Sequence, residues 1–454
     1  MPKNTPEKPR VVVVGAGFAG LYVAKSLKRA PVEVLMIDQH NYHTFQPLLY
    51  QVATAGLEPS EIAHTVRGTF QRQKNFNFQM GTVTNVDRDA QIVELADGRH
   101  VPYDYLVMCA GAVYNDFGVP GVKKHGLFLK SLSEAVNLRS HILRQFERVS
   151  ADPSLVDRGA LNFVIVGGGP TGVEMAGTMA ELFDRVLPKD FPDLDVSKAN
   201  IIMLEMLDSV LPPFHKSSRD YTEKVLRERG VDVRLGTTVA EVHADKVELK
   251  NGETIPTDTL IWAAGIRASP LVEALGVELT RGYRVKVERD LSLPSHRNIF
   301  IVGDMAGATD DEGNLYPQLA PVAIQQGKHA GKQVTRLAKG KETQPFSYFD
   351  KGVMAIIGRN AGVAELSKNF LGLRFRGFPA WAAWLFIHLV YLIGHQNRFN
   401  VLANWAYSYL TYDLHARLIT NMEPSPAEVA NRLEQLTSEK PVAKQRASEA
   451  KLTS

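Results

Sequence analysis

The chain has 454 residues, of which 44% are hydrophobic and 22% charged, and its formal net charge is +3. This length predicts about three domains with enough apolar material for a hydrophobic core. The small net charge gives no indication of a nucleic-acid partner. The single cysteine, Cys109, excludes an intramolecular disulfide, a redox cysteine pair and a thiolate metal cluster.

The first motif is VVVVGAGFAG, at Val11–Gly20. An apolar strand runs into G-x-G-x-x-G, formed by Gly15, Gly17 and Gly20, and a helix-compatible stretch follows. In this setting the glycines allow a tight turn, close backbone approach to a pyrophosphate, and close packing of helix on strand. The next apolar strand, residues 32–38, ends on Asp38, at the spacing of an acid that binds a ribose. Asp38 could alternatively only cap a turn.

The second motif is FVIVGGGPTG, at Phe163–Gly172, and repeats the same pattern with Gly167, Gly169 and Gly172. Its second strand, residues 200–206, carries Glu205 after a longer, Pro- and Asp-rich crossover. A carboxylate there would repel a 2′-phosphate, which favours NADH over NADPH; a solvated charge at the strand end is the alternative. Two such motifs predict two bound dinucleotides and electron transfer between them.

Three strand ends carry small residues that let backbone approach a ring: Ala110–Gly111, Ala264–Gly265 and Gly303–Asp304. Residues 41–67, which are rich in aromatic residues and Gln, predict a loop and short helix lining a ligand. We expect no metal site, because no HExxH, Cys/His cluster or calcium loop occurs.

The C-terminal part is apolar and aromatic. Residues 378–394 contain only His388 as a polar residue, and no segment reaches the ~20 apolar residues of a membrane span. Residues 400–419 show two helical stripes, one that runs from Asn400 to His415 and another that runs from Val401 through Ala416 to Ile419. Trp and Tyr beside Arg are typical of a helix in a membrane interface, with core packing as the alternative. We expect a further helix at 424–438 and a disordered end.

Taken together, GAGFAG, GGGPTGVE, HTFQPLLYQVATAGLEPSEIA, IWAAGIR, IFIVGDMA, LAPVAIQQG and FDKGVMAIIGR make the chain resemble the type II NADH:quinone oxidoreductases. The resemblance implies an α/β fold of two Rossmann-like domains, the second inserted in the first. The FAD domain would comprise residues 1–118 and 268–345, and the NADH domain residues 119–267. Residues 346–420 would form a membrane-associating region of amphipathic helices, and residues 421–454 a polar tail.

The resemblance also implies roles for individual residues. FAD would contact Gly15, Gly17, Phe18, Ala19, Gly20, Asp38, Gln39, Gln46, Ala110, Gly111, Gly303 and Asp304. NADH would contact Gly167, Gly169, Pro170, Thr171, Gly172, Glu174, Glu205, Ala264 and Gly265. Quinone would approach Ala320, Gln325 and Gln326, and the catalytic residues would be Glu174 and Gln325. Pro321 stands where the family has a glutamine.

The expected activity is transfer of hydride from NADH to FAD and of two electrons to a membrane quinone, without proton pumping. The resemblance implies a monotopic homodimer on the cytoplasmic face of a bacterial inner membrane. Disulfide reductases and sulfide:quinone oxidoreductases require cysteines that this chain lacks. A reductase of a soluble redox partner and an NADH-gated interaction module remain as alternatives.

Overall fold

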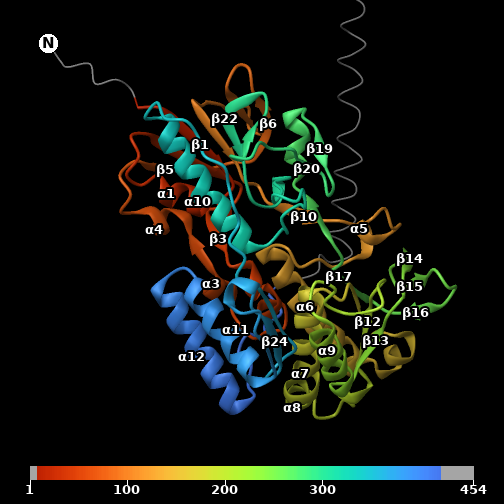
Figure 1. Cartoon of the computed structure of the whole chain (residues 1–454). Coiled ribbons are helices and arrows are strands. Elements are labelled where there is room, and N and C mark those ends of the chain that lie inside the picture. The colour runs from red at the N-terminus through yellow and green to blue at the C-terminus, as the bar shows by residue number, and fades with distance from the viewer. Residues whose placement is uncertain (1–7, 421–454) are drawn as a thin grey trace, which may run out of the picture.

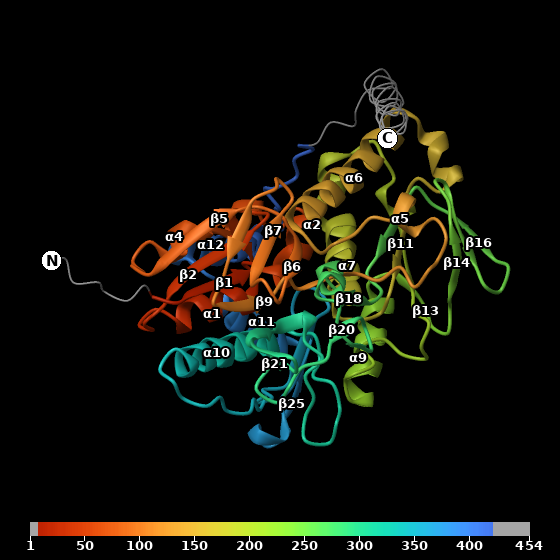
Figure 2. The same ribbon diagram turned by 90° about the horizontal axis from the view of Figure 1, so that it is seen from above.

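The computed structural model describes residues 8–420, and the helix expected at 424–438 lies outside them. Figures 1 and 2 show two α/β bodies side by side, and in Figure 1 the C-terminal helices lie below the first body and beside the second. Each body is built on a mainly parallel sheet, and one strand of each sheet leads directly into a glycine motif.

The first sheet has six strands in the order β21-β22-β9-β1-β2-β5, and every neighbouring pair is parallel except β21 with β22. Val11–Val14 are buried on both faces of this sheet, which explains why the strand is continuously apolar rather than alternating. The strands are β21 (Ser292–Leu293), β22 (His296–Ile301), β9 (Tyr105–Met108), β1 (Arg10–Val14), β2 (Glu33–Asp38) and β5 (Phe76–Met80).

Helices α1 (Phe18–Ser26) and α10 (Ala320–Leu337) pack closely against each other. A Cβ atom on Gly327 would lie 2.3 Å from the carbonyl oxygen of Ala19, and one on Gly331 would lie 2.7 Å from Cβ of Ser26. Glycine at these two positions therefore allows α10 to pack directly against α1, the helix that follows the first glycine motif.

The second sheet has four parallel strands in the order β13-β12-β11-β17. Its strands are β13 (Val231–Arg234), β12 (Asn200–Leu204), β11 (Asn162–Val166) and β17 (Thr259–Trp262), and its main helices are α6 (Leu132–Ala151), α7 (Pro170–Glu181) and α9 (Lys216–Glu228). The two bodies are joined where β10 (Ala112–Tyr114) pairs antiparallel with β18 (Ile266–Ala268). The segments after the two small-residue turns thus meet each other.

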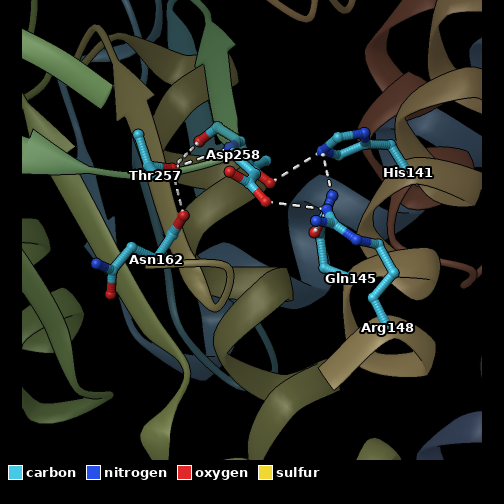
Figure 3. A network of polar contacts seen from close by, with 7 residues as sticks. His141, Gln145, Arg148, Asn162, Thr257 and Asp258 are labelled. Atoms are coloured by element: carbon cyan, nitrogen blue, oxygen red, sulfur yellow. Dashed lines mark hydrogen bonds and ion pairs between the residues drawn. The ribbon is translucent and has the colours of Figure 1, made fainter. Parts of the chain in front are cut away.

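A polar network fixes α6 to the second sheet (Figure 3). The Nε2 atom of His141 lies 3.0 Å from Oγ1 of Thr259 and 3.1 Å from Nε2 of Gln145. The Nη1 atom of Arg148 donates to Oε1 of Gln145 at 2.7 Å and to Oδ2 of Asp258 at 2.9 Å. This network holds the helix that begins beside the first glycine motif against the body that contains the second.

Smaller antiparallel sheets complete the two bodies. They comprise β6 (Val83–Asp87), β7 (Ile92–Leu95) and β8 (His100–Pro102); β14 (Val239–Val242), β15 (Lys246–Leu249) and β16 (Thr254–Pro256); and β19 (Leu279–Thr280) with β20 (Arg284–Val285). Residues 41–67 contain more regular structure than the sequence predicts, because β3 (Tyr42–Thr44) pairs with β4 (Ala63–Thr65) around the short helices α2 (Leu49–Ala53) and α3 (Pro59–Ile62).

The C-terminal region contributes to the main hydrophobic core. It comprises β23 (Val353–Ile356), β24 (Gly362–Glu365), β25 (Arg374–Arg376), α11 (Phe378–Tyr391) and α12 (His395–Thr411). Trp384 of α11 is 1% exposed and Val401 of α12 is fully buried, and both belong to the same core cluster as α6 and α7. Helices α11 and α12 are therefore packed into the main hydrophobic core.

The prediction that both helical stripes continue to His415 and Ile419 is wrong, because α12 ends at Thr411. Tyr412 adopts a left-handed conformation with φ of 55°, which terminates the helix. The guanidinium of Arg359 donates to the carbonyl oxygens of Ser408 at 2.8 Å and Tyr409 at 3.1 Å. The Ser408 carbonyl thus gains a second donor beside the N–H of Tyr412, and the Tyr409 carbonyl gains a donor beyond the end of the helix.

Candidate active site

The first glycine motif forms the turn that the sequence predicts. Gly15 has φ of +109°, and a Cβ atom there would lie 2.4 Å from the carbonyl oxygen of Cys109. A Cβ atom on Gly20 would lie 1.9 Å from the carbonyl oxygen of Gly15, whereas one on Gly17 would meet nothing within 4 Å. Gly15 and Gly20 thus allow close packing of the chain. Gly17 leaves an open backbone face at the start of α1, as a pyrophosphate requires.

The second motif repeats this geometry. Gly167 also has φ of +109°, a Cβ atom on Gly172 would lie 1.9 Å from the carbonyl oxygen of Gly167, and Gly169 faces open space. The same backbone face is therefore offered to a second diphosphate at the start of α7.

The two strand-end acids hold these turns in place. The Oδ2 atom of Asp38 accepts a hydrogen bond from the backbone N–H of Ala16 at 2.6 Å, and Oε2 of Glu205 accepts one from Gly168 at 2.6 Å. Burial raises the pKa of Asp38, opposed by hydrogen bonds from the backbone of His40 and Ala16. Turn capping and ribose binding are compatible roles, because each carboxylate oxygen can accept more than one hydrogen bond.

A large cavity, about 1190 Å³, opens beside the first turn. Its lining includes most residues predicted to contact FAD together with two from the start of α7: Gly15, Gly17, Phe18, Ala19, Asp38, Gln39, Gln46, Ala110, Gly111, Gly303, Asp304, Thr171 and Glu174. Ala320, at the start of α10, also lines it. The two glycine motifs therefore converge on one cavity, although the second turn and Glu205 do not themselves line it.

Lys130 also lines the cavity, although its place in the sequence does not predict this. Its Nζ atom lies 3.8 Å from Oδ2 of Asp304, which comes from the end of the first sheet. Burial raises the pKa of Asp304, opposed by the positive charges of Lys130 and Arg284. No local pattern marks Lys130, because only the fold brings the start of α6 to this strand end.

Glu174 is the most strongly perturbed acid in the cavity. Burial raises the pKa of its carboxyl to about 8, opposed by hydrogen bonds from the backbone of Ile356 and the side chain of Trp384. The N–H of Ile356 lies 3.4 Å from Oε1. Its neighbour Tyr50 is also buried in the cavity wall, which raises the pKa of that phenol. Glu174 is therefore a largely protonated acid at neutral pH.

Comparison with known proteins identifies the family. The pyridine nucleotide-disulphide oxidoreductase family model matches residues 9–327. The type II NADH:quinone oxidoreductase Ndh of Mycobacterium tuberculosis is 38% identical over 99% of this chain and 98% of its own length. NdhA of the same organism is 39% identical over 88% of this chain and 87% of its own. The chain belongs to the type II NADH:quinone oxidoreductases. It oxidises NADH and passes the electrons through FAD to a quinone.

Solved structures show how widely this fold is shared. That of NDH2 from Plasmodium falciparum in complex with NADH has a TM-score of 0.81 at 18% identity, and covers 91% of this chain and 100% of that one. The sulfide:quinone oxidoreductase from Aquifex aeolicus has a TM-score of 0.65 at 17% identity, and covers 91% of this chain and 93% of that one. The fold alone does not separate these activities, whereas the single cysteine of this oxidoreductase does.

The two glutamines of α10 in this type II oxidoreductase have different surroundings. The amide of Gln325 pairs with the backbone of Phe349, donating to its carbonyl oxygen at 2.9 Å and accepting from its N–H at 3.0 Å. Gln326 is buried, and its Oε1 accepts from the N–H of Gly303 at 2.7 Å. Gln326 therefore holds the turn before Asp304, and its contact with quinone stays a prediction.

His43 is a buried imidazole beside the first glycine turn. Its Nδ1 lies 2.9 Å from the carbonyl oxygen of Ala16 in the first glycine turn. Burial lowers the pKa of this imidazole to about 4, so the ring is neutral and Nδ1–H donates to Ala16. His43 therefore supports the turn from a buried position that does not line the cavity.

Proposed function

We propose that FAD occupies the 1190 Å³ cavity and that NADH reaches it from the second glycine turn. The observation that supports this assignment is that Thr171 and Glu174, at the start of α7, line the same cavity as Gly15–Ala19. The open faces at Gly17 and Gly169 fit two diphosphates. The FAD domain would then be residues 1–118 with 268–345, and the NADH domain residues 119–267.

The protein supplies binding and electrostatics for chemistry that belongs to the cofactors. When bound, the flavin takes up hydride from NADH and releases two electrons to quinone. The glycine turns bind the diphosphates, and Asp38 and Glu205 accept hydrogen bonds from the ribose hydroxyls. Lys130 and Asp304 would orient the phosphate and ribityl arm, since their ion pair lies on the cavity wall.

Glu174 would act as the proton donor near the reacting ring. A carboxyl with a pKa of about 8 is protonated at neutral pH and can give up its proton to a developing anion. Its place near the start of α7 would put it at the junction of the two nucleotide sites. Ala320 and Gln325 would lie on the quinone side, at the start of α10.

The enzyme would dock on the membrane through the outer face of α11 and α12. Phe386, Phe399 and Leu410 are 68%, 71% and 81% exposed, which is unusual for large apolar side chains on one face. Between residues 8 and 420, no helix combines the length and apolarity needed to cross a bilayer. Monotopic attachment at the cytoplasmic face of a bacterial inner membrane fits this face, and the homodimer remains a prediction from the family.

A direct experiment tests the site assignment. The purified chain is assayed for bound flavin and for NADH oxidation at 340 nm with a short-chain quinone, alongside Glu174→Gln. We expect a yellow protein whose variant binds flavin and NADH normally but reduces quinone slowly. A colourless chain that does not take up flavin would overturn the cavity assignment. A variant with wild-type quinone turnover would remove Glu174 from proton transfer.

A further inference from the structure

Three cationic side chains lie near one another, Lys25 on α1, Lys328 on α10 and Arg398 on α12, since two share one aromatic ring and the charge of the third acts on Lys25. The Nζ atoms of Lys25 on α1 and Lys328 on α10 each lie 4.9 Å from the centre of the Tyr22 ring. Burial and the nearby charges of Arg398 and Lys328 lower the pKa of Lys25. We call Lys25, Lys328 and Arg398 the cationic corner.

Acidic partners do not neutralise this corner. Within the described part of the chain, none of its three members forms an ion pair with a carboxylate, whereas many other lysines and arginines do. Arg398 is held in place by carbonyl groups at the end of α11, donating to Leu392 at 2.7 Å and Val390 at 2.8 Å. The first turn of α12 also contains no acid. The three cations therefore share a local excess of positive charge.

The corner lies at the edge of the exposed apolar face of α11 and α12. Arg398 donates to the carbonyl of Val390, whose side chain is 49% exposed, and precedes Phe399 in sequence. Phe386 lies one turn before Val390, and Leu402 one turn after Phe399. Both are also exposed. An apolar face bordered by cations without acidic partners matches a bilayer, with acyl chains beneath and headgroups at the border.

We infer that the cationic corner binds the phosphate group of an anionic phospholipid when the apolar face docks. This inference rests on the membrane docking proposed above and names the lipid chemistry that the docking face selects. The phosphate would lie between the two lysine ammonium groups, and the fixed Arg398 would present a third donor. Charge complementarity favours a lipid headgroup over an apolar partner at this border.

The test is vesicle co-sedimentation of the full-length enzyme. Two vesicle compositions are compared, phosphatidylcholine alone and phosphatidylcholine mixed with phosphatidylglycerol. Lys25→Gln with Lys328→Gln is compared with wild type and with Lys250→Gln plus Lys286→Gln, which removes two charges outside the corner. At roughly 1 kcal/mol per cation near an anionic leaflet, the corner variant should bind mixed vesicles about 30-fold more weakly. The control variant should bind as wild type does.

The outcomes separate the two proposals. Equal binding of wild type to both vesicle types, or unchanged binding of the corner variant, would overturn the lipid site while leaving apolar docking in place. Absence of wild-type binding to either vesicle would overturn docking itself. If inorganic phosphate stabilises wild type but not the corner variant, and phosphatidylglycerol adds no binding, the site takes free phosphate and the lipid assignment fails. The corner variant should keep full activity on a short-chain quinone, which shows that it is folded.

Discussion

The indole Nε1 of Trp405 donates a 2.7 Å hydrogen bond to Oε1 of Gln51, 354 residues earlier in the chain. The amide of Gln51 in turn donates to the hydroxyl of Tyr50 at 2.8 Å, and Tyr50 lines the cavity. The C-terminal helices therefore support the wall of the active site from behind. This contact links the proposed membrane-docking face to the residues around Glu174.

We expect Trp405→Phe to weaken this support. The substitution keeps an aromatic ring but leaves the buried Oε1 of Gln51 without its donor, which costs about 1–3 kcal/mol. The thermal midpoint, followed by circular dichroism, should fall relative to wild type. Tyr407→Phe, on an exposed side chain of the same helix, should leave the midpoint unchanged. An unshifted Trp405→Phe midpoint would show that Gln51 finds another partner.

Local geometry made the two glycine turns predictable from the sequence. Gly15 and Gly167 need a positive φ, and Gly20 and Gly172 need close packing, so strand, turn and helix follow from a few adjacent residues. Lys130 was missed because it reaches the cavity only through long-range packing, and the contact of Trp384 with Glu174 was missed for the same reason. The helix end at Thr411 was missed because Arg359, a distant residue, satisfies the last carbonyl groups.

Glu205→Gln should narrow the preference for NADH over NADPH. The substitution removes the charge that would repel a 2′-phosphate while keeping the size of the side chain. Both carboxylate oxygens accept backbone N–H groups, from Gly168 at 2.6 Å and Leu207 at 2.8 Å, so the amide also loses one of these acceptors. The ratio of kcat/KM for the two nucleotides is the measurement. An unchanged ratio would confine Glu205 to turn capping.

Substitution of the two adjacent glutamines should separate quinone binding from flavin binding. Gln325→Ala frees the backbone of Phe349 on the quinone side and should raise the KM for quinone more than the KM for NADH. Gln326→Ala instead leaves the N–H of Gly303 without its acceptor and should lower flavin content. Steady-state kinetics and the flavin-to-protein absorbance ratio, measured for both variants, distinguish the two effects. The reverse pattern would exchange the roles assigned here.

Polar substitution of the apolar face should release the enzyme from membranes without unfolding it. Phe386→Ser with Leu410→Ser changes two highly exposed side chains, whereas removal of the whole C-terminal region would expose the core around Trp384. The membrane-bound fraction and activity on a long-chain quinone should fall together. Activity on a short-chain quinone should persist. A variant that still sediments with membranes would place the docking surface elsewhere.

The buried carboxyl of Glu174 should make both stability and quinone reduction depend on pH. Its pKa is about 8 in the folded protein, above its ordinary value of 4.5. Between these two pH values the folded chain therefore keeps a proton that the unfolded chain has lost. The stabilisation that this carboxyl contributes is therefore full below pH 4.5. It falls as pH rises above that value, by up to about 1.4 kcal/mol per pH unit.

Glu174→Gln isolates this dependence because the amide is neutral at every pH. The stability of wild type relative to the variant should decline as pH rises towards about 8 and level off above it. Quinone-dependent turnover of wild type should fall over the same upper range as the carboxyl loses its proton, while the variant should show slow turnover without that step. Thermal midpoints and pH–rate profiles measured in parallel test both. Coincident wild-type and variant profiles would mean that another group controls the proton supply.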